Sequence, residues 1–206
     1  MRFPSKRIHS IDTFFDAYTE ELRRAAATVS REKLIAAESI ISAAIDRGAN
    51  IFVSGNGGSA AISNHLACDH AKGIQTDTSL RPRVQSLAAN VELITAVAND
   101  ISYDDVFAFQ MASFAQPGDL LITISSSGNS ENIVRAIQWA REHAVKTIAM
   151  TGFNGGRSAQ LSDVNLHVES GNYGIVEDIH QSLMHTLAQF IRQSHMPEEL
   201  ILARKF

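Results

Sequence analysis

The first fifty residues repeat apolar side chains at helical spacing. Apolar positions between Ile11 and Ala25 recur every three or four residues, and a second series between Leu34 and Ala44 does the same. This period predicts two amphipathic helices. Gly48 is expected to end the second helix, because glycine readily leaves the helical conformation.

After these helices, short β-rich runs alternate with helical stretches. The predicted strands lie at 51–53, 84–88, 120–124, 147–150 and 164–168, and the predicted helices at 59–72, 91–98, 104–115, 130–143 and 175–194. This alternation is typical of a parallel sheet with helices on both faces. We therefore expect an α/β fold with a doubly wound five-stranded sheet. Residues 1–48 would form its helical N-terminal segment and residues 49–206 the α/β core of the same single domain.

Composition narrows the possible classes of protein. Hydrophobic residues make up 45% of the chain and charged residues 19%, which is an ordinary globular balance. The net charge is -4 and no run of Lys or Arg exceeds a pair, so we expect no nucleic-acid partner. No apolar run approaches the roughly 20 residues that cross a bilayer. The lone Cys68 and an N-terminus without an apolar leader stretch predict a cytoplasmic protein.

The loop after the first predicted strand is rich in glycine and leads into a helix. Its residues Ser54 to Ser59 read SGNGGS. Glycines let the backbone approach a ligand, and a helix N-terminus favours an anion. A Walker loop is excluded because no Lys-Ser/Thr pair follows, and the glycine spacing disfavours a dinucleotide site. Many strand-to-helix turns are glycine-rich for steric reasons alone, so this loop by itself is only a moderate signal of an anion site.

The loop after the third predicted strand carries more hydroxyl groups than a helix cap requires. Residues 125–130 read SSSGNS and precede the helix that begins at Glu131. One Ser or Asn would be enough to cap that helix. Four serines and a glycine at a helix N-terminus instead favour phosphate binding. Because neither loop contains a cluster of Lys or Arg, the expected ligand is a small metabolite with one phosphate group.

Acidic and histidine side chains recur at helical spacing in two further segments. His65 and Asp69 lie four residues apart and share a face, while Asp178, Gln181 and His185 form a stripe with Glu177 at its edge. These residue types suit zinc, but such pairs also occur on ordinary surfaces and no compact motif such as HExxH is present. The pair at 99–100, Asn-Asp, is either a plain turn or a carboxylate at the mouth of the same cleft.

Taken together, these motifs resemble those of the phosphoheptose (sedoheptulose 7-phosphate) isomerases, in the sugar isomerase (SIS) domain superfamily. The resemblance covers nearly the whole chain. It rests on GNGGS with a following His, Val-Ala-Asn-Asp, SSSGNS, Met150-Thr151-Gly152 with Gly155-Gly156, and a late Glu-x7-His. It implies the SIS fold, an isomerase of sugar phosphates, and a homotetramer whose active sites lie where subunits meet.

The resemblance also implies roles for individual residues. The implied substrate-binding residues are Asn56, Gly57, Gly58, Ser59, Asn99, Asp100, Ser125, Ser126, Ser127 and Ser130. One zinc ion per subunit would be bound by His65, Asp69, Glu177 and His185, of which the last three are also candidates for acid–base catalysis. The chain departs from the family at three positions, with Asp69 for Glu, Glu177 for Gln and Gly174 for Asp.

The expected reaction moves a proton between C1 and C2 of a sugar phosphate through an enediolate. Either zinc polarises the carbonyl group, or Asp69 or Glu177 acts as the base and His185 as the acid without a metal. Two other functions stay open at this point. They are a non-catalytic partner protein of the same fold, like the relatives that associate with replication initiators, and a sugar-phosphate sensor.

Overall fold

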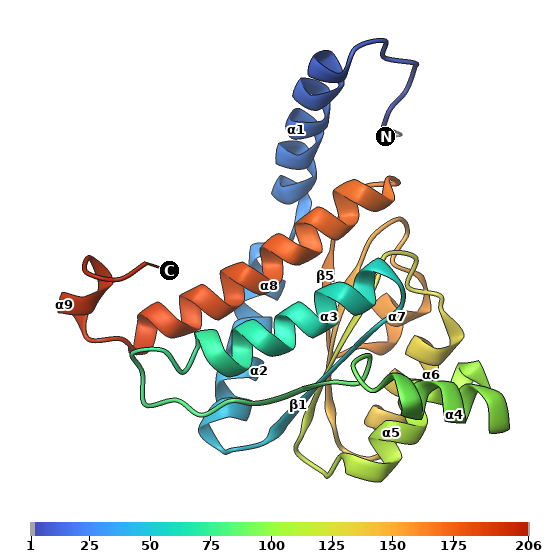
Figure 1. Cartoon of the computed structure of the whole chain (residues 1–206), viewed down its shortest axis with the longest axis vertical. Helices are drawn as coiled ribbons and strands as arrows, with labels where there is room; N and C mark the ends of the chain where they lie inside the picture. Colours follow the sequence, from blue (N-terminus) through green and yellow to red (C-terminus); the bar gives the residue numbers. More distant parts are fainter. Residues whose placement is uncertain (1–2, 206) are drawn as a thin grey trace.

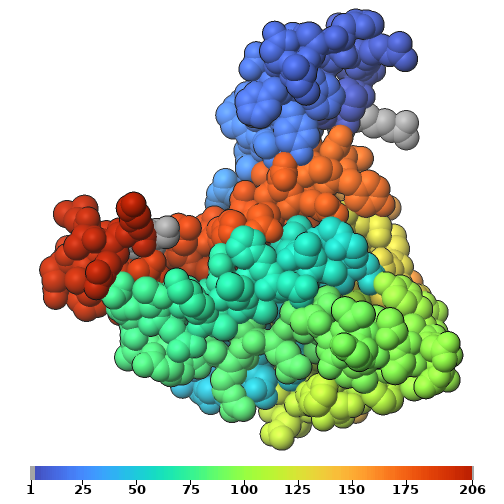
Figure 2. All heavy atoms as spheres, viewed as in Figure 1, coloured from blue at the N-terminus to red at the C-terminus, as the bar shows by residue number. Residues whose placement is uncertain are grey.

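The computed structural model describes residues 3–205. Two helices come first, α1 (Ile11–Thr28) and α2 (Arg31–Asp46), as the apolar spacing predicts. The Ser30 hydroxyl caps α2 by accepting a hydrogen bond from the Lys33 backbone N–H at 3.3 Å. α1 stands out from the body of the molecule and packs on it through α8 (Tyr173–His195) (Figures 1 and 2).

A five-stranded parallel sheet forms the centre of the molecule. Its strands are β1 (Asn50–Gly55), β2 (Arg83–Ser86), β3 (Leu120–Ser125), β4 (Lys146–Thr151) and β5 (Val164–His167), in the order β2-β1-β3-β4-β5. Every residue of the central strand β3 is buried, because helices cover both of its faces. The predicted doubly wound α/β sheet is confirmed.

The remaining helices lie on the two faces of this sheet, except the short last helix, which lies away from the sheet beyond the end of α8 (Figure 1). They are α3 (Gly58–Cys68), α4 (Val91–Asp100), α5 (Val106–Phe114), α6 (Glu131–Glu142), α7 (Gly156–Leu161), α8 and α9 (Glu198–Ile201), with a 3-10 turn η2 (Tyr103–Asp105). Side chains alternate across a strand, so Ile51 and Val53 face one layer while Phe52 faces the other. The first layer contains α2, α3 and α8, and the second contains α4, α5 and α6.

The order of the strands determines where the loops meet. The chain passes from β1 outward to β2 and then returns to β3 on the other side of β1. Gly55 at the end of β1 pairs with Ile124 near the end of β3. The two Ser/Gly-rich loops therefore leave the sheet side by side, at the switch point where parallel sheets bind ligands.

The helix predicted at 59–72 differs from the structure in its second half. α3 ends at Cys68, and a π-helix, η1 (Asp69–Gly73), follows it directly. Short π-helices often occur at functional sites, because their wider turn redirects a side chain. Asp69 is the first residue of this turn. The short helices α7 and α9 are likewise absent from the predicted set.

Two histidines, His70 and His180, belong to the core and not to a site. Both are fully buried, and burial lowers the pKa of each to about 4, so both are neutral near pH 7. Among residues 3–205, no helix has the length and apolar character to cross a bilayer.

Candidate active site

A small polar cavity lies at the carboxyl ends of β1 and β3. Its volume is about 150 Å³. It is lined by Asn56 and Ser59 of the first loop, Ile124, the four serines Ser125, Ser126, Ser127 and Ser130 of the second, and Tyr173 and Glu177 of α8. Both predicted loops therefore contribute to one cavity.

The hydroxyl groups of the second loop are only partly used by the protein itself. The Ser125 and Ser127 hydroxyls accept hydrogen bonds from the backbone N–H groups of Gly128 (3.2 Å) and Asn129 (3.3 Å). Ser130 is the residue before α6, yet within the described part of the chain its side chain makes no capping bond. The Ser126 hydroxyl is buried and has no hydrogen-bond partner among residues 3–205. The loop is thus more than a helix cap, and it can offer donors to an anion at the start of the 12-residue helix α6.

Gly128 holds this loop against the loop that follows β4. Its φ is +65°, a conformation that favours glycine, and an added Cβ would collide with the carbonyl oxygen of Gly155. The Ser158 backbone N–H also donates to the Gly128 carbonyl at 2.9 Å. The loop at residues 125–130, called the serine loop below, is therefore held in place by the segment that follows β4.

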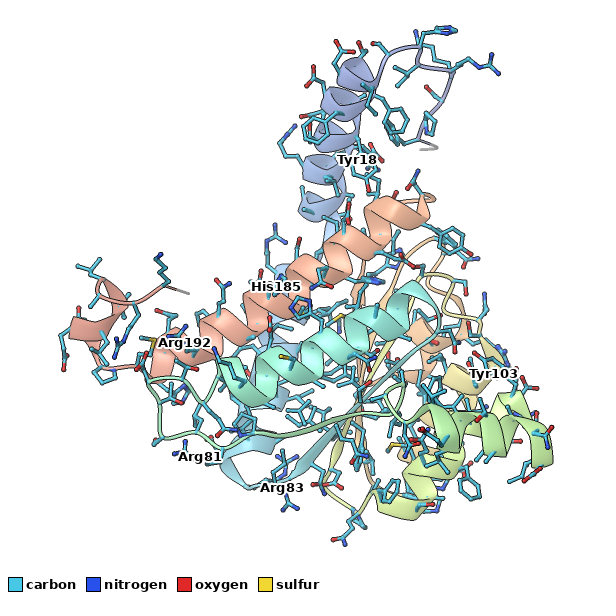
Figure 3. The ribbon with its side chains drawn as sticks, viewed as in Figure 1. Tyr18, Arg81, Arg83, Tyr103, His185 and Arg192 are labelled. Atoms are coloured by element: carbon cyan, nitrogen blue, oxygen red, sulfur yellow. The ribbon has the colours of Figure 1, made fainter. Side chains whose placement is uncertain are left out.

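Asn56 of the first loop is held by two side chains from other segments. Its amide exchanges hydrogen bonds with the amide of Asn132 on α6, at 2.8 and 3.0 Å. The hydroxyl of Tyr103, a residue labelled in Figure 3, donates to the Asn56 side-chain oxygen at 2.9 Å. Sequence reasoning missed both partners, because nothing in the spacing of residues 56, 103 and 132 shows that they meet.

The predicted pair Asn99 and Asp100 lies at the end of α4. The Asn99 amide donates to the Asp100 carboxylate at 2.7 Å. Within the described residues, neither side chain lines the cavity of the serine loop. Tyr103, three residues later, brings this segment close to the first loop through Asn56.

Glu177 faces the serine loop from α8. Its carboxylate packs against Gly58 at the first turn of α3, where a Cβ would come within 2.6 Å of the Glu177 Oε2. Burial, and after it the neighbouring Asp178 carboxylate, raise the pKa of Glu177 above that of an ordinary glutamate. A carboxylate with a raised pKa is a stronger base.

Asp178 is engaged by Tyr18 of α1. The Tyr18 hydroxyl donates to Asp178 Oδ2 at 2.6 Å, and burial together with this carboxylate raises the pKa of Tyr18 to about 12. The same hydroxyl explains the glycine at position 174, because an added Cβ there would lie 2.9 Å from it. Tyr18 therefore occupies space that a side chain at position 174 would need.

A second group of predicted site residues lies further along α3 and α8, which run side by side (Figure 1). His65 Nε2 is 3.4 Å from Asp69 Oδ1, and His185 Nε2 is 3.3 Å from Asp69 Oδ2. One ligand atom from each residue lies within 4.8 Å of the others. The structure thus brings together three of the four predicted ligands. Two imidazoles and a carboxylate fit a catalytic zinc ion with an open position.

Glu177 lies outside this group, which differs from the four-ligand set implied by the resemblance. Among the described residues, only His65, Asp69 and His185 form the cluster. Glu177 precedes His185 by two helical turns, about 12 Å along the helix axis. Its carboxylate is directed to Gly58 at the other end of α3.

The cluster also has a neutral member that the sequence interpretation left out of the site. Gln181 Nε2 lies 2.6 Å from His65 Nδ1 and 3.3 Å from His185 Nε2. The only signal in the sequence was the shared stripe of Gln181 and His185 on one helix. Beyond Asp69 and His185 opens a hollow of about 410 Å³, whose rim includes Lys72 and Arg192.

Comparisons with known proteins agree with this geometry. The model of the SIS domain family matches residues 13–152. The probable phosphoheptose isomerase of Thermoplasma acidophilum is 37% identical over 174 residues, which cover 84% of this chain and 95% of that protein. The phosphoheptose isomerase of Aliarcobacter butzleri is also 37% identical, over 86% of this chain and 93% of its own length.

A solved structure shows the same architecture. The structure of a phosphoheptose isomerase from Neisseria gonorrhoeae superimposes with a TM-score of 0.81 at 29% identity, covering 88% of this chain and 98% of that one. The match to the family model includes both Ser/Gly-rich loops and the strands β1 to β4. The chain belongs to the SIS domain family and, within it, to the phosphoheptose isomerases.

Proposed function

We propose that this chain is an aldose–ketose isomerase that converts sedoheptulose 7-phosphate to a heptose 7-phosphate through an enediolate. One observation carries the proposal. A cavity of serine hydroxyls at a helix N-terminus and a cluster of two histidines and an aspartate lie along the same pair of helices, α3 and α8. A phosphate site and an acid–base or metal site are the two parts that such a reaction requires.

The spacing of residues along α8 supports a direction for the substrate. Tyr173 and Glu177 line the serine cavity, while Gln181 and His185 follow on the next two turns. The phosphate group would bind at Ser125–Ser130, and the sugar carbons would extend along α8 towards His185. Glu177 would then lie beside the chain of carbons, between the phosphate and the cluster.

His65, Asp69 and His185 are the residues that would hold zinc, one ion per subunit. When bound, zinc would supply Lewis-acid polarisation of the substrate carbonyl. Residues of the chain itself bind the substrate and transfer the proton. The serine loop binds and orients the phosphate, and Glu177 takes the proton from one carbon and returns it to the next. The raised pKa of Glu177 makes its carboxylate a better proton acceptor than an ordinary glutamate.

Replacing Glu177 by glutamine should keep the fold and lower kcat at least tenfold, about 1.4 kcal/mol of transition-state stabilisation. An amide has the shape of the carboxylate but cannot accept the proton. The acid side of the pH profile provides a second readout. Because the pKa of Glu177 is raised, its carboxylate is protonated at a higher pH than that of an ordinary glutamate. Activity should therefore begin to fall at that higher pH as the solution is acidified, and the variant should not show this acidic decline.

Steady-state kinetics of Glu177→Gln beside Glu142→Gln, an exposed glutamate of α6, would measure this effect. The control should behave as the parent protein does. Full turnover in Glu177→Gln would assign the proton transfer to Asp69 and remove Glu177 from the mechanism.

A homotetramer is the assembly that we propose for this chain. Large apolar side chains stand exposed on α1, α2 and α8, among them Phe15 of α1 (63% exposed), Ile35 of α2 (66%) and Phe190 of α8 (50%). Ile35 and Phe190 also line an apolar groove of about 250 Å³ between α2 and α8. Contact with other copies would bury these faces.

Light scattering at micromolar concentration should therefore give the mass of four chains. Ile35→Glu places a charge on this surface and should shift the mass downwards, whereas Glu142→Gln should not. A stable monomer of the parent protein would contradict the tetramer and any site shared between subunits.

A turnover assay with sedoheptulose 7-phosphate tests the function itself. Formation of an aldose phosphate is the expected result. Binding of the sugar phosphate without turnover would indicate a sensor, and neither binding nor turnover would indicate a non-catalytic partner protein. A cytoplasmic location stays a prediction from the sequence.

A further inference from the structure

Three polar side chains from distant segments form one hydrogen-bonded group beside the serine cavity. They are Asn56 of the first loop, which lines that cavity, Asn132 of α6 and Tyr103 of η2. The two amides exchange hydrogen bonds at 2.8 and 3.0 Å. The Tyr103 hydroxyl donates to Asn56 Oδ1 at 2.9 Å. Tyr103 and Asn132 do not themselves line the cavity in the described part of the chain, so they can act on a ligand there only through Asn56.

We propose that Tyr103 is a positioning residue: together with Asn132 it holds the Asn56 amide with an N–H group towards the serine cavity, where that group donates to an oxygen of the bound phosphate. This inference rests on the phosphate site of the proposed function. It adds one oriented donor from the first loop to the hydroxyl groups of the second.

The hydrogen bonds of Asn56 determine what its amide can offer to a ligand. Its Oδ1 atom accepts from the Tyr103 hydroxyl and from Asn132 Nδ2, which uses both lone pairs of that oxygen. Its nitrogen carries two N–H groups, and one of them donates to Asn132 Oδ1. Among the hydrogen bonds described for residues 3–205, the other N–H has no acceptor. The Asn56 amide therefore offers a donor to a ligand and no unused lone pair, which suits an anion.

Tyr103 selects between two orientations of the amide pair. A half-turn of both amides would preserve the two bonds between Asn56 and Asn132, because each amide would again donate to the other and accept from it. It would also place the Asn56 nitrogen in front of Tyr103 and leave the oxygen with an unused lone pair. A phenolic hydroxyl donates better than it accepts, because its lone pairs are delocalised into the ring. Tyr103 therefore favours the orientation that keeps an N–H group for the phosphate.

The helix that follows the serine loop also holds Tyr103 in place. Arg135 of α6 donates two hydrogen bonds to the carboxylate of Asp105, in the same 3-10 turn as Tyr103, at 2.8 and 2.9 Å. Asn132 and Arg135 are three residues apart and share a face of α6. One face of α6 thus anchors both partners of Asn56. The donor from the first loop is held relative to the loop that carries the serines.

Calorimetric titration with inorganic phosphate and with sedoheptulose 7-phosphate tests the role of Tyr103 without measuring turnover. Tyr103 is 54% exposed, so Tyr103→Phe should fold and melt as the parent protein does. It should bind both ligands about three- to tenfold more weakly, the range expected for one hydrogen bond between neutral groups. In steady-state kinetics KM should rise while kcat stays within about twofold. Thr95→Val is the matched control, because the Thr95 hydroxyl bonds only to backbone carbonyls of its own helix α4.

Two variants of Asn56 separate a donor from an acceptor. Asn56→Ala removes the amide and should weaken phosphate binding about tenfold or more, as expected for a hydrogen bond to a charged group. Asn56→Asp keeps the shape and can still accept from Tyr103 and Asn132, but it has no N–H and places a negative charge beside the phosphate. It should therefore bind phosphate more weakly than Asn56→Ala does.

A double-mutant cycle shows whether Tyr103 acts through Asn56. Tyr103→Phe should weaken binding little further when Asn56 is already alanine. The proposal is overturned by parent-like binding in Tyr103→Phe, by an equal effect of Tyr103→Phe with and without Asn56, by phosphate binding in Asn56→Asp as strong as in Asn56→Ala, or by failure of the parent protein to bind phosphate. A chain that binds both ligands as expected but does not isomerise sugar phosphates would refute only the proposed function.

Discussion

Replacing Ser125 and Ser130 together by alanine should raise KM for the sugar phosphate about a hundredfold or more. Both hydroxyls line the serine cavity, and the Ser130 side chain is not used to cap α6 in the described structure. A hydrogen bond to a charged group contributes about 1.5–3 kcal/mol. Loss of two such bonds amounts to about 3 kcal/mol or more, which corresponds to a factor of about 150 in binding. The chemical step should change less, since the reacting carbons lie away from the phosphate.

The double variant should still fold. Within the described residues, the one internal bond lost is that from the Gly128 N–H to the Ser125 hydroxyl, at 3.2 Å. Gly128 remains held by its contact with Gly155 and by the bond from Ser158. Inorganic phosphate, used as a competitive inhibitor, should also bind more weakly, by a factor similar to that for the substrate. Ser113→Ala on α5 serves as the control, and an unchanged KM in the double variant would remove this loop from the site.

The sequence was most informative where hydrophobic pattern and chemistry coincide. β3 is a mainly apolar run, interrupted by Thr123, because both of its faces are covered. The serine loop follows it directly, so the position of that loop at the edge of the sheet could be predicted. The two pairs His65–Asp69 and Gln181–His185 were visible as helical spacings. Their meeting across α3 and α8 was not, because it depends on how two helices pack on the sheet.

Other features were hidden because they are set by long-range contacts or by small changes in helical geometry. The π-helix at Asp69–Gly73 follows α3 without a break, so the sequence predicts one ordinary helix there, and only the structure shows the wider turn. The direction of the Glu177 carboxylate depends on the space left by Gly58. The amide of Asn56 is oriented by Tyr103 and Asn132, which come from distant segments.

His185→Ala should abolish isomerase activity and release any bound zinc. The imidazole of His185 lies 3.3 Å from Asp69 Oδ2 and 3.3 Å from Gln181 Nε2, so its removal takes from the cluster the histidine that α8 contributes. If His185 is a metal ligand, its loss opens the metal site on the side of α8. If His185 is the acid, its loss removes a proton transfer that typically raises the reaction rate about a hundredfold to ten-thousandfold. We therefore expect kcat to fall by about a thousandfold or more.

Elemental analysis of the purified variant, together with turnover and thermal melting, separates the two roles. His195→Ala is the matched control, because His195 lies on the same helix and its ring contacts only the Ile191 carbonyl oxygen among the bonds described for residues 3–205. His185 is half-buried, so its truncation should change the melting temperature little. Loss of both zinc and turnover would assign His185 to the metal centre, whereas retained zinc with lost turnover would assign it to proton transfer. Full activity of the parent protein after its zinc has been stripped would refute the metal-assisted mechanism and leave Glu177 or Asp69 as an unassisted base.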